Sequence, residues 1–382
     1  MEQLRAISMR SASFDEAKLR TEVREFLADE ITAGTFEPRD NNWVACNRAF
    51  SRNCGERGYI GMTWPSRYGG GEKTPRERLI VCEEMLAAGA PLGSHWVADR
   101  QSGPQILRNA PESLKQAILP RIVAGKCTFA IGMSEPDSGS DLSSIRTAAA
   151  KADGGWRLNG RKVWTTNAHE ADYMIVLCRT EPRGEDRYAG LSQLVVPVRS
   201  TGVTVRPIVN LAGWHELNEV TFDDVFLPDD HLLGRGGDGW RLVTEELAFE
   251  RSGPDRFLSS FIILRVLVEQ IGKDPDRLAA TEIGRLLSRL VAVRSLSLSI
   301  ADMLESGRTV IKAATMMKDM GTILEQEIPE VARKLMPTVP SLDGTRFQRN
   351  LANAILNAPS FTIRGGTREI LKGIIARELG VR

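Results

Sequence analysis

The sequence predicts an α+β multidomain protein in which a helical part, a β part and a second helical part follow one another. Three observations support this order. Apolar residues recur at helical spacing up to about residue 127, short apolar runs between turn residues fill residues 128–235, and helical spacing then returns. We therefore expect an N-terminal helical domain over residues 1–127, a middle β-domain over residues 128–235 and a C-terminal helical domain over residues 236–382.

Three helices are predicted in the N-terminal part. Ser13–Glu16 has the pattern of a capping box, in which a hydroxyl and a carboxylate bind the first free backbone amides. The apolar stripe that follows it consists of Leu19, Val23, Phe26 and Leu27. Thr74–Glu77 repeats the start signal, with Pro at the first helical position, and opens a helix over Leu79–Ala88. A third helix is expected over Glu112–Ala124, ended by Gly125.

Short strands are predicted in the middle part. Trp156–Trp164 is expected to form a hairpin, since Asn159-Gly160 is typical of a two-residue turn. Tyr173–Cys178 and Leu191–Val196 have the composition of buried strands, and Glu219–Val225 alternates between apolar and polar residues.

Helical spacing dominates the C-terminal part. A long amphipathic stripe is expected to run along Arg285–Ser306 and to supply bundle core and an oligomer interface. Asp343–Gln348 interrupts the helical pattern, and Thr367 can cap a final helix over Arg368–Leu379.

Composition excludes several classes of protein. The 50 Lys and Arg balance 49 Asp and Glu, which argues against a nucleic-acid-binding protein. No apolar run reaches the roughly 18–20 residues that span a membrane, and no secretory signal is visible. The five cysteines are scattered, with no disulfide or metal-ligand spacing. We expect a reduced, cytoplasmic protein without a metal site, in which Cys127 and Cys178 are small apolar core residues.

Two stretches of the β part carry candidate chemistry. Phe129–Asp141 leads from a strand into a loop of small and hydroxyl residues, which suits either a flat polar ligand or an ordinary surface turn. Lys162–Asn167 places the aromatic face of Trp164 beside the hydroxyls of Thr165 and Thr166, and a core position is the alternative for this indole.

In this order, these stretches resemble the acyl-CoA dehydrogenase family, and the resemblance extends over nearly the whole chain. Further matching segments are Gly190-Leu-Ser, Glu219–Pro228, Gly237-Asp-Gly-Trp240 and Gly366-Thr367-Arg-Glu-Ile-Leu. The resemblance implies an N-terminal helical domain, a middle β-barrel or β-sandwich domain and a C-terminal four-helix bundle. It also implies FAD as cofactor and oxidation of an acyl-CoA thioester at its α,β carbon–carbon bond.

The resemblance assigns a cofactor site to the β part. It implies that Ser134 hydrogen-bonds the pyrimidine edge of the flavin and that Ser140 lies near the pyrophosphate or the pantetheine arm. It implies further that Trp164 flanks the isoalloxazine ring and that Thr166 contacts its N5 and O4 region. The remaining expected cofactor-binding residues are Met133, Gly139 and Thr165.

The resemblance also suggests a catalytic base. Many family members carry it in the loop before the last helix, but here Gly365 occupies that position and has no side chain. Branches similar to the isovaleryl and long-chain enzymes place it on an earlier helix, directly before an Arg. The matching residues are Glu250, which we expect to remove the α-proton, and Arg251, which we expect to brace the final loop. The alternative for Glu250 is an exposed helix acid that pairs with Lys or Arg. Asp255 is the nearest substitute. Two histidines, His169 and His215, are either further substrate contacts or solvated, locally hydrogen-bonded side chains near turns.

Two departures from the family pattern bear on assembly. Family homotetramers complete the flavin site with a neighbour's Arg-x-x-Phe-Gly segment and a Gln-x-x-Gly-Gly-x-Gly loop, whereas this chain has Gln270–Arg277 and Pro340–Thr345 there. The resemblance therefore suggests a homo- or hetero-oligomer, with a heterotetramer including a second dehydrogenase-like subunit suspected, and an electron-transfer flavoprotein as acceptor. The substrate expected is a bulky, branched or steroid-derived acyl-CoA. The alternatives are a catalytically silent subunit and a same-fold flavin oxidase or monooxygenase.

Overall fold

Two compact units make up the chain. The structure is a computed structural model that describes residues 14–381. One unit, here called the helical unit, contains the chain up to Trp43, Lys73–Ala90 and the chain from Ala248 onward. The other, here called the sheet unit, contains Val44–Glu72 and Pro91–Leu247. Described residues near both ends of the chain belong to the helical unit, so these units are not continuous stretches of sequence. The expected domain boundaries at residues 127 and 235 stay a prediction.

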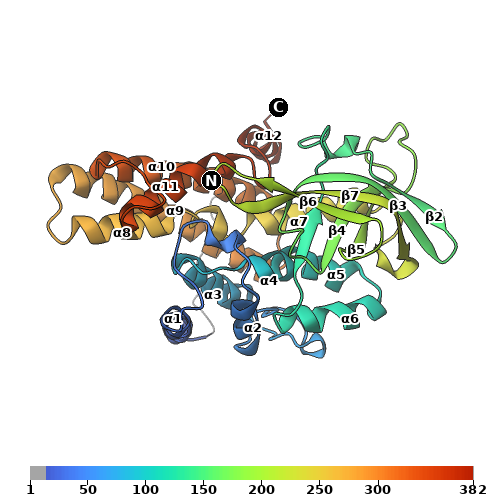
Figure 1. The fold of residues 1–382 in the computed structure, drawn as a ribbon, viewed down its shortest axis with the longest axis horizontal. Coiled ribbons are helices and arrows are strands. Elements are labelled where there is room, and N and C mark those ends of the chain that lie inside the picture. Colours follow the sequence, from blue (N-terminus) through green and yellow to red (C-terminus); the bar gives the residue numbers. More distant parts are fainter. Residues whose placement is uncertain (1–13, 382) are drawn as a thin grey trace. The chain divides into compact units, whose positions relative to one another are not determined.

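A four-helix bundle forms most of the helical unit (Figure 1). Its helices are α8 (Phe261–Ile271), α9 (Arg277–Glu305), α10 (Ile311–Leu335) and α11 (Arg346–Asn357), and α12 (Arg368–Glu378) packs against α10. They share one apolar core that includes Leu264, Leu286 and Leu324. The predicted stripe on α9 supplies part of this core, and the helix begins earlier than expected because Asp276 caps it.

Two N-terminal helices complete the helical unit: α1 (Glu16–Thr32) and α3 (Pro75–Ala87). The capping box at Thr74 is present as predicted. Ser13 lies outside the described residues, and the N-cap of α1 is Asp15, whose carboxylate accepts the amide of Lys18 at 3.0 Å. Ion pairs attach these helices to each other and to α9, namely Arg20–Glu84 and Arg294–Glu83, each 2.6 Å long.

The sheet unit is built on one eight-stranded sheet. Its strands are β1 (Phe129–Gly132), β2 (Ala148–Ala152), β3 (Gly155–Thr166), β4 (Tyr173–Arg179), β5 (Leu191–Pro197), β6 (Val203–Val209), β7 (His215–Pro228) and β8 (Leu232–Leu233). They are ordered β6-β7-β3-β2-β4-β5-β8, and β1 pairs in parallel with β4. Side chains from β1 to β7 share one core, so the sheet curves around it. The strands predicted at Tyr173 and Leu191 are confirmed.

In the described part of the chain, four α-helices of the sheet unit precede the strands in the sequence, and one α-helix follows them. They are α2 (Arg48–Glu56), α4 (Gly93–Val97), α5 (Gly103–Asn109), α6 (Glu112–Val123) and α7 (Gly239–Arg251), of which α7 crosses from the sheet unit into the helical unit at Ala248. The predicted end of α6 is confirmed, because Gly125 has a left-handed backbone with φ of 65°.

The predicted hairpin at Asn159-Gly160 is wrong. Strand β3 runs straight through this dipeptide, which forms a register irregularity against β7. A side chain at Gly160 would come within 2.5 Å of Thr147, so a glycine is needed there for close approach. The turn that the sequence interpretation missed is Asp153-Gly154, which joins β2 to β3 with φ of 68° at Gly154.

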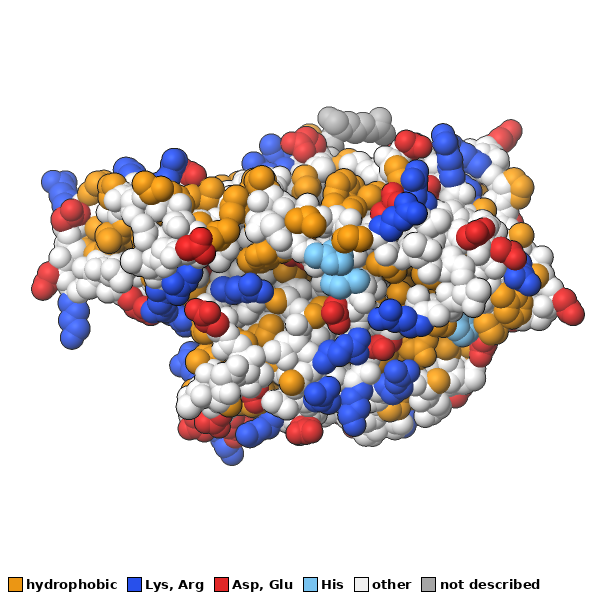
Figure 2. Space-filling view, in the orientation of Figure 1, with side chains coloured by type: hydrophobic (Ala, Val, Ile, Leu, Met, Phe, Trp, Pro, Cys, Tyr) orange, Lys and Arg blue, Asp and Glu red, His pale blue; other side chains and the backbone are white. Residues whose placement is uncertain are grey.

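The described surface and thiols agree with the composition. Acidic and basic side chains are interspersed on the face drawn in Figure 2. Within residues 14–381, no helix is both long and apolar enough to cross a membrane. All five cysteines are free, and burial raises the pKa of Cys127 and of Cys178 to about 12. Neither thiol is a nucleophile near neutral pH, as predicted.

Candidate active site

The two stretches singled out in the β part meet in the sheet unit. The amide of Val163 on β3 donates a 2.9 Å hydrogen bond to the carbonyl of Ser134, directly after β1. Ser134 is half-buried, and its hydroxyl makes no hydrogen bond to any described residue. The structure therefore brings the loop of Ser134 beside the strand that carries Trp164, which the sequence interpretation had placed in one cofactor site.

A buried ion pair fixes the loop that follows Ser134. Lys162 Nζ lies 2.9 Å from both the Glu135 carboxylate and the carbonyl of Met133. The same carboxylate accepts the amides of Arg146 and Thr147 at 2.7 and 2.9 Å. Burial alone would raise the pKa of Glu135, but the ammonium and these donors outweigh it and hold the pKa below its usual value. The loop is thus tied at both ends to the sheet.

Trp164 projects from a bulge in β3. The register shifts between Lys162 and Thr165, and Trp164 adopts φ of 60°, a left-handed conformation that is rare for a bulky residue. A bulge redirects a side chain, and here the indole is 59% exposed. The alternative of a core position for Trp164 is therefore wrong. Backbone strain that presents an aromatic face outward is typical of a ligand site.

The neighbouring hydroxyls differ in exposure. Thr165 is buried, and its Oγ1 has no hydrogen-bond partner among the described residues. Thr166 is half-buried and lies opposite Leu217 in the sheet. Gly139 and Ser140 are exposed farther along the loop, and the space around Gly139 is open.

The two candidate histidines form a stacked pair. The ring centroids of His169 and His215 are 3.9 Å apart. Buried Asn218 contacts both rings, at 3.2 Å and 2.7 Å, and its amide donates to the carbonyl of Thr165 at 3.0 Å. Burial and the charge of His215 lower the pKa of His169. The pair thus supports the strand end that bears Thr165, a pairing that residue spacing could not reveal.

In the helical unit, the predicted base Glu250 lies beside Gly365, the glycine at the position where many family members carry their base. Glu250 stands near the end of α7, and its side chain is 18% exposed. A Cβ built on Gly365 would lie 3.1 Å from Glu250 Oε1. Asp255, the predicted substitute, is fully buried and pairs with Arg256 at 3.0 Å, so it is not available to a substrate.

Three cations hold the last loop in place. Arg251 Nε donates to the carbonyl of Gly365 at 2.9 Å, which is the contact expected of it. Lys318 Nζ donates to the carbonyls of Gly366 and Phe361 at 3.0 and 3.3 Å. Arg364 pairs with buried Glu325 at 2.9 Å. The loop that carries Gly365 is therefore held by hydrogen bonds and an ion pair from α7 and α10.

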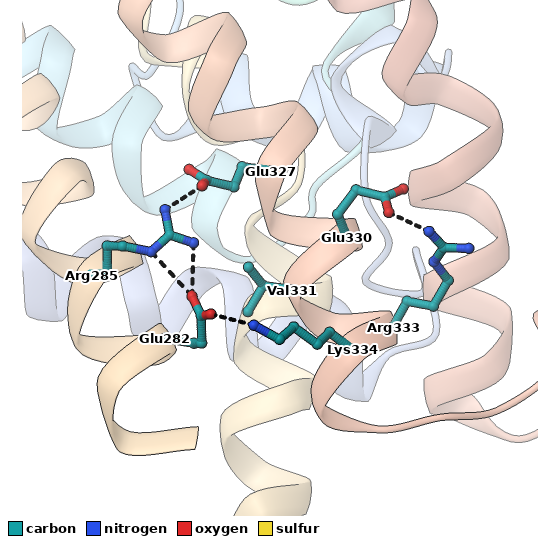
Figure 3. Close-up of a pocket in the computed structure, with 7 residues that line it drawn as sticks. All are labelled: Glu282, Arg285, Glu327, Glu330, Val331, Arg333 and Lys334. Carbon is teal, nitrogen blue, oxygen red and sulfur yellow. Dashed lines mark hydrogen bonds and ion pairs between the residues drawn. The ribbon is translucent and has the colours of Figure 1, made fainter. Parts of the chain in front are cut away.

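A separate pocket on the bundle carries no catalytic arrangement. It has a volume of about 510 Å³ and lies between α9 and α10 (Figure 3). Figure 3 shows its charges paired with each other, with Glu282 held by Arg285 and Lys334, and Glu330 by Arg333. Since these groups neutralise one another, we regard this pocket as a groove between surface ion pairs.

Comparison with known proteins identifies the family. Residues 13–126, 130–225 and 269–380 match the N-terminal, middle and C-terminal domains of acyl-CoA dehydrogenases. The chain belongs to the acyl-CoA dehydrogenase family. It is 30% identical to acyl-CoA dehydrogenase FadE29 of Mycobacterium tuberculosis, over 95% of each chain.

Solved structures agree with this acyl-CoA dehydrogenase fold. The ChsE4-ChsE5 complex from Mycobacterium tuberculosis is 26% identical, with a TM-score of 0.84 over 98% of this chain and 99% of that one. The Tcur3481-Tcur3483 steroid ACAD is 23% identical, with a TM-score of 0.85 over 98% and 99% of the two chains, and supports the fold alone. The predicted three-part architecture is confirmed.

Acyl-CoA dehydrogenases are FAD-dependent oxidoreductases, and the sheet unit fits this cofactor. A flavin needs a flat apolar neighbour and hydrogen-bond partners for its polar edge. The exposed indole of Trp164 offers the first, and the unpaired hydroxyls of Ser134 and Thr165 offer the second. The cofactor-binding roles of the individual residues stay a prediction.

Sequence reasoning missed three charged residues that organise these sites. Glu135 and Lys162 lay inside the quoted stretches without a role, although a lysine at an inward position of a strand is a signal of a buried ion pair. Arg256 follows the predicted base by less than two helical turns, and its importance depends on the fold of the chain after α7.

Proposed function

We propose that this acyl-CoA dehydrogenase oxidises the α,β carbon–carbon bond of an acyl-CoA and that Glu250 is the catalytic base. The observation that carries the proposal is the 3.1 Å distance between Glu250 Oε1 and the position of a Cβ on Gly365. The two places where family members carry the base are therefore neighbours in this structure, and of these two positions it is Glu250 that carries a carboxylate.

The chemistry assigns distinct tasks to the chain. An α-proton beside a thioester is weakly acidic, so the site must stabilise the developing enolate with oriented donors while a carboxylate takes the proton. Glu250 is the group that takes it, and Arg251 keeps the adjoining loop in position through the carbonyl of Gly365. Bound FAD supplies the electron acceptor for the β-hydrogen, which leaves as hydride. Ser134, Trp164 and Thr166 would hold and orient its ring.

A bulky, branched or steroid-derived acyl group is the substrate we propose. This proposal rests on an analogy of fold with the Tcur3481-Tcur3483 structure, which is described as a steroid ACAD.

We also propose an oligomer with a second, dehydrogenase-like subunit and an electron-transfer flavoprotein as acceptor. The ChsE4-ChsE5 complex, a relative at 26% identity, supports a heteromeric assembly. The departures at Gln270–Arg277 and Pro340–Thr345 point the same way. The cytoplasmic location expected from cysteine usage stays a prediction.

The test of Glu250 uses the holoenzyme, purified together with its partner subunit. Isovaleryl-CoA, octanoyl-CoA and the CoA thioester of a steroid side chain are added without oxygen, and flavin absorbance is followed. We expect at least one thioester to bleach the flavin, and Glu250→Gln to lower the bleaching rate by at least about a thousandfold while the protein stays yellow. The matched control is Glu245→Gln on the same helix, which loses only an exposed ion pair with Arg241.

Other outcomes point to other functions. Normal bleaching by the Glu250→Gln enzyme would remove Glu250 from this role. A chain that binds no FAD in any assembly would be a silent subunit, and stoichiometric peroxide in air would indicate an oxidase or a monooxygenase.

A further inference from the structure

A buried arginine joins the proposed base to a second carboxylate. Arg256 lies in the short helix Pro254–Arg256 after α7, and its side chain is only 4% exposed. Its Nη2 is 3.0 Å from Glu250 Oε1, and its Nε is 3.0 Å from Asp255 Oδ2. The same Nε donates to the backbone carbonyl of Glu250 at 3.2 Å. One guanidinium therefore contacts both the backbone and the side chain of Glu250.

We infer that the Asp255–Arg256 pair is a positioning device that holds the Glu250 carboxylate beside Gly365 and sets how strongly it binds a proton. This rests on the proposed role of Glu250. A free glutamate loses side-chain entropy when it is fixed, and a guanidinium that is itself buried removes most of that cost before substrate binds.

Asp255 has a separate task in this arrangement. A single arginine beside a carboxylate makes it a weaker base, which opposes proton abstraction. Buried Asp255 shares the positive charge of Arg256, so Glu250 is not its sole counter-ion. Burial alone would lower the pKa of Arg256, but Asp255, Glu250 and Glu325 more than offset this effect and raise it. Arg256 thus stays charged throughout the working pH range.

Other charged groups surround the pair. They are Arg251 on α7, Lys318 and Glu325 on α10, and Arg364 on the last loop. Arg251, Lys318 and Arg364 donate to backbone carbonyls of the last loop or of Asp255. Among the described residues, it is Arg256 whose donor lies within hydrogen-bond distance of the Glu250 carboxylate.

The test measures the pH dependence of flavin bleaching with the fastest thioester of the panel, from pH 5.5 to 9.5. Arg256→Gln should raise the apparent pKa of the base by about 1 unit or more and lower the limiting rate about tenfold to a hundredfold. Asp255→Asn should shift the apparent pKa in the opposite direction, because Arg256 then has Glu250 as its main partner. Arg256→Lys keeps the charge but not both contacts, so the pKa should stay near that of the wild type while the rate falls.

Opposite shifts from the two neighbouring variants are the decisive result, since a purely structural role would not move the pH profile. Arg333→Gln, at an exposed surface pair, is the control and should change neither quantity. If Arg256→Gln does not fold, the rate of Arg256→Lys and the pKa shift of Asp255→Asn still test the inference. Profiles that coincide with wild type, with Glu250→Gln inactive, would overturn this inference alone. An active Glu250→Gln enzyme would overturn the proposed function instead.

Discussion

Glu250 is the penultimate residue of α7 and Gly365 lies shortly before α12, yet they meet in the helical unit. Gly365 has φ of 67°, a conformation that a side chain adopts only with strain. The sequence shows that a glycine stands at the usual position of the base and that Glu250 is the candidate on an earlier helix. It does not show that the Glu250 carboxylate lies beside Gly365, because that depends on how the last loop packs against α7.

Moving the carboxylate tests this convergence. We expect Glu250→Ala to be nearly inactive and the double variant Glu250→Ala with Gly365→Glu to bleach flavin at least about tenfold faster than the single variant. The left-handed backbone costs roughly 1–2 kcal/mol for any residue but glycine, so wild-type activity is not expected. Gly365→Ala in the Glu250→Ala background is the control, since it adds the strain without the carboxylate. Equal rates for the double variant and this control would contradict the convergence.

Lys318 gives the helical unit a distinct pH dependence. Burial, followed by the charges of Arg256 and Arg364, lowers its pKa to about 7. An unfolded lysine keeps its proton up to about pH 10.4, so between pH 7 and 10 the unfolded chain binds more protons than the native one. The free energy of unfolding should therefore rise with pH across this window.

Urea unfolding at pH 7 and 9.5 checks the effect of Lys318. From pH 7 to 9.5, the free energy of unfolding of the wild type should rise by about 1–3 kcal/mol more than that of Lys318→Met. The change of the unfolding free energy with pH is what counts, not its absolute value, because the variant also loses two hydrogen bonds at every pH. Lys334→Met, at an exposed pair, should follow the wild-type slope. Parallel curves for wild type and Lys318→Met would contradict the lowered pKa.

Among the elements, the loop between β1 and β2 depends most on one interaction. Lys162 and Glu135 are both buried, and together they secure the backbone on either side of Ser134. Removal of one partner leaves a buried charge without its counter-ion, which typically costs about 3–5 kcal/mol.

Lys162→Met should therefore lower the free energy of unfolding by about 3–5 kcal/mol and reduce the FAD content of the purified protein. The double variant Glu135→Leu with Lys162→Met should lose less stability than the single one, since no buried charge remains. Lys151→Met, at an exposed pair between β2 and Asp229 directly after β7, should change stability by less than about 1 kcal/mol. Thermal unfolding measures the stability, and flavin absorbance measures the FAD content. If Lys162→Met behaves like Lys151→Met in both measurements, the prediction is wrong.

Elements with local signals were predictable from the sequence. The capping box at Thr74, the stop at Gly125 and the cap at Thr367 each depend on residues within one turn, and each is present. The hairpin at Gly160 failed because Asn-Gly also suits a bulge, and only the contact with Thr147 decides between them. Asp153-Gly154 carries the same kind of turn signal and forms the turn between β2 and β3.

At the scale of the whole molecule, the order of helical, β and helical parts followed from hydrophobic period, and the family followed from several motifs in sequence. The two compact units did not follow, because α1 and α3 join the C-terminal bundle through Arg20, Glu83, Glu84 and Arg294. Such long-range ion pairs leave no periodic trace in a single sequence. The buried charge of Glu135 had a signal in Lys162, at an inward position of its strand, whereas that of Arg256 depends on how the chain folds after α7.

Assembly is the property of the whole molecule that remains to be measured. The residues at Gln270–Arg277 and Pro340–Thr345 lack the family segments with which a neighbouring copy completes a flavin site. We therefore expect the chain expressed alone to carry clearly less than one FAD per chain. Co-expression with an adjacent dehydrogenase-like reading frame should give a complex of both chains with more FAD per copy of this chain. Native mass spectrometry and flavin absorbance decide between this and a homotetramer with one FAD in every chain, which would show that a copy of this chain completes its own cofactor site through other residues.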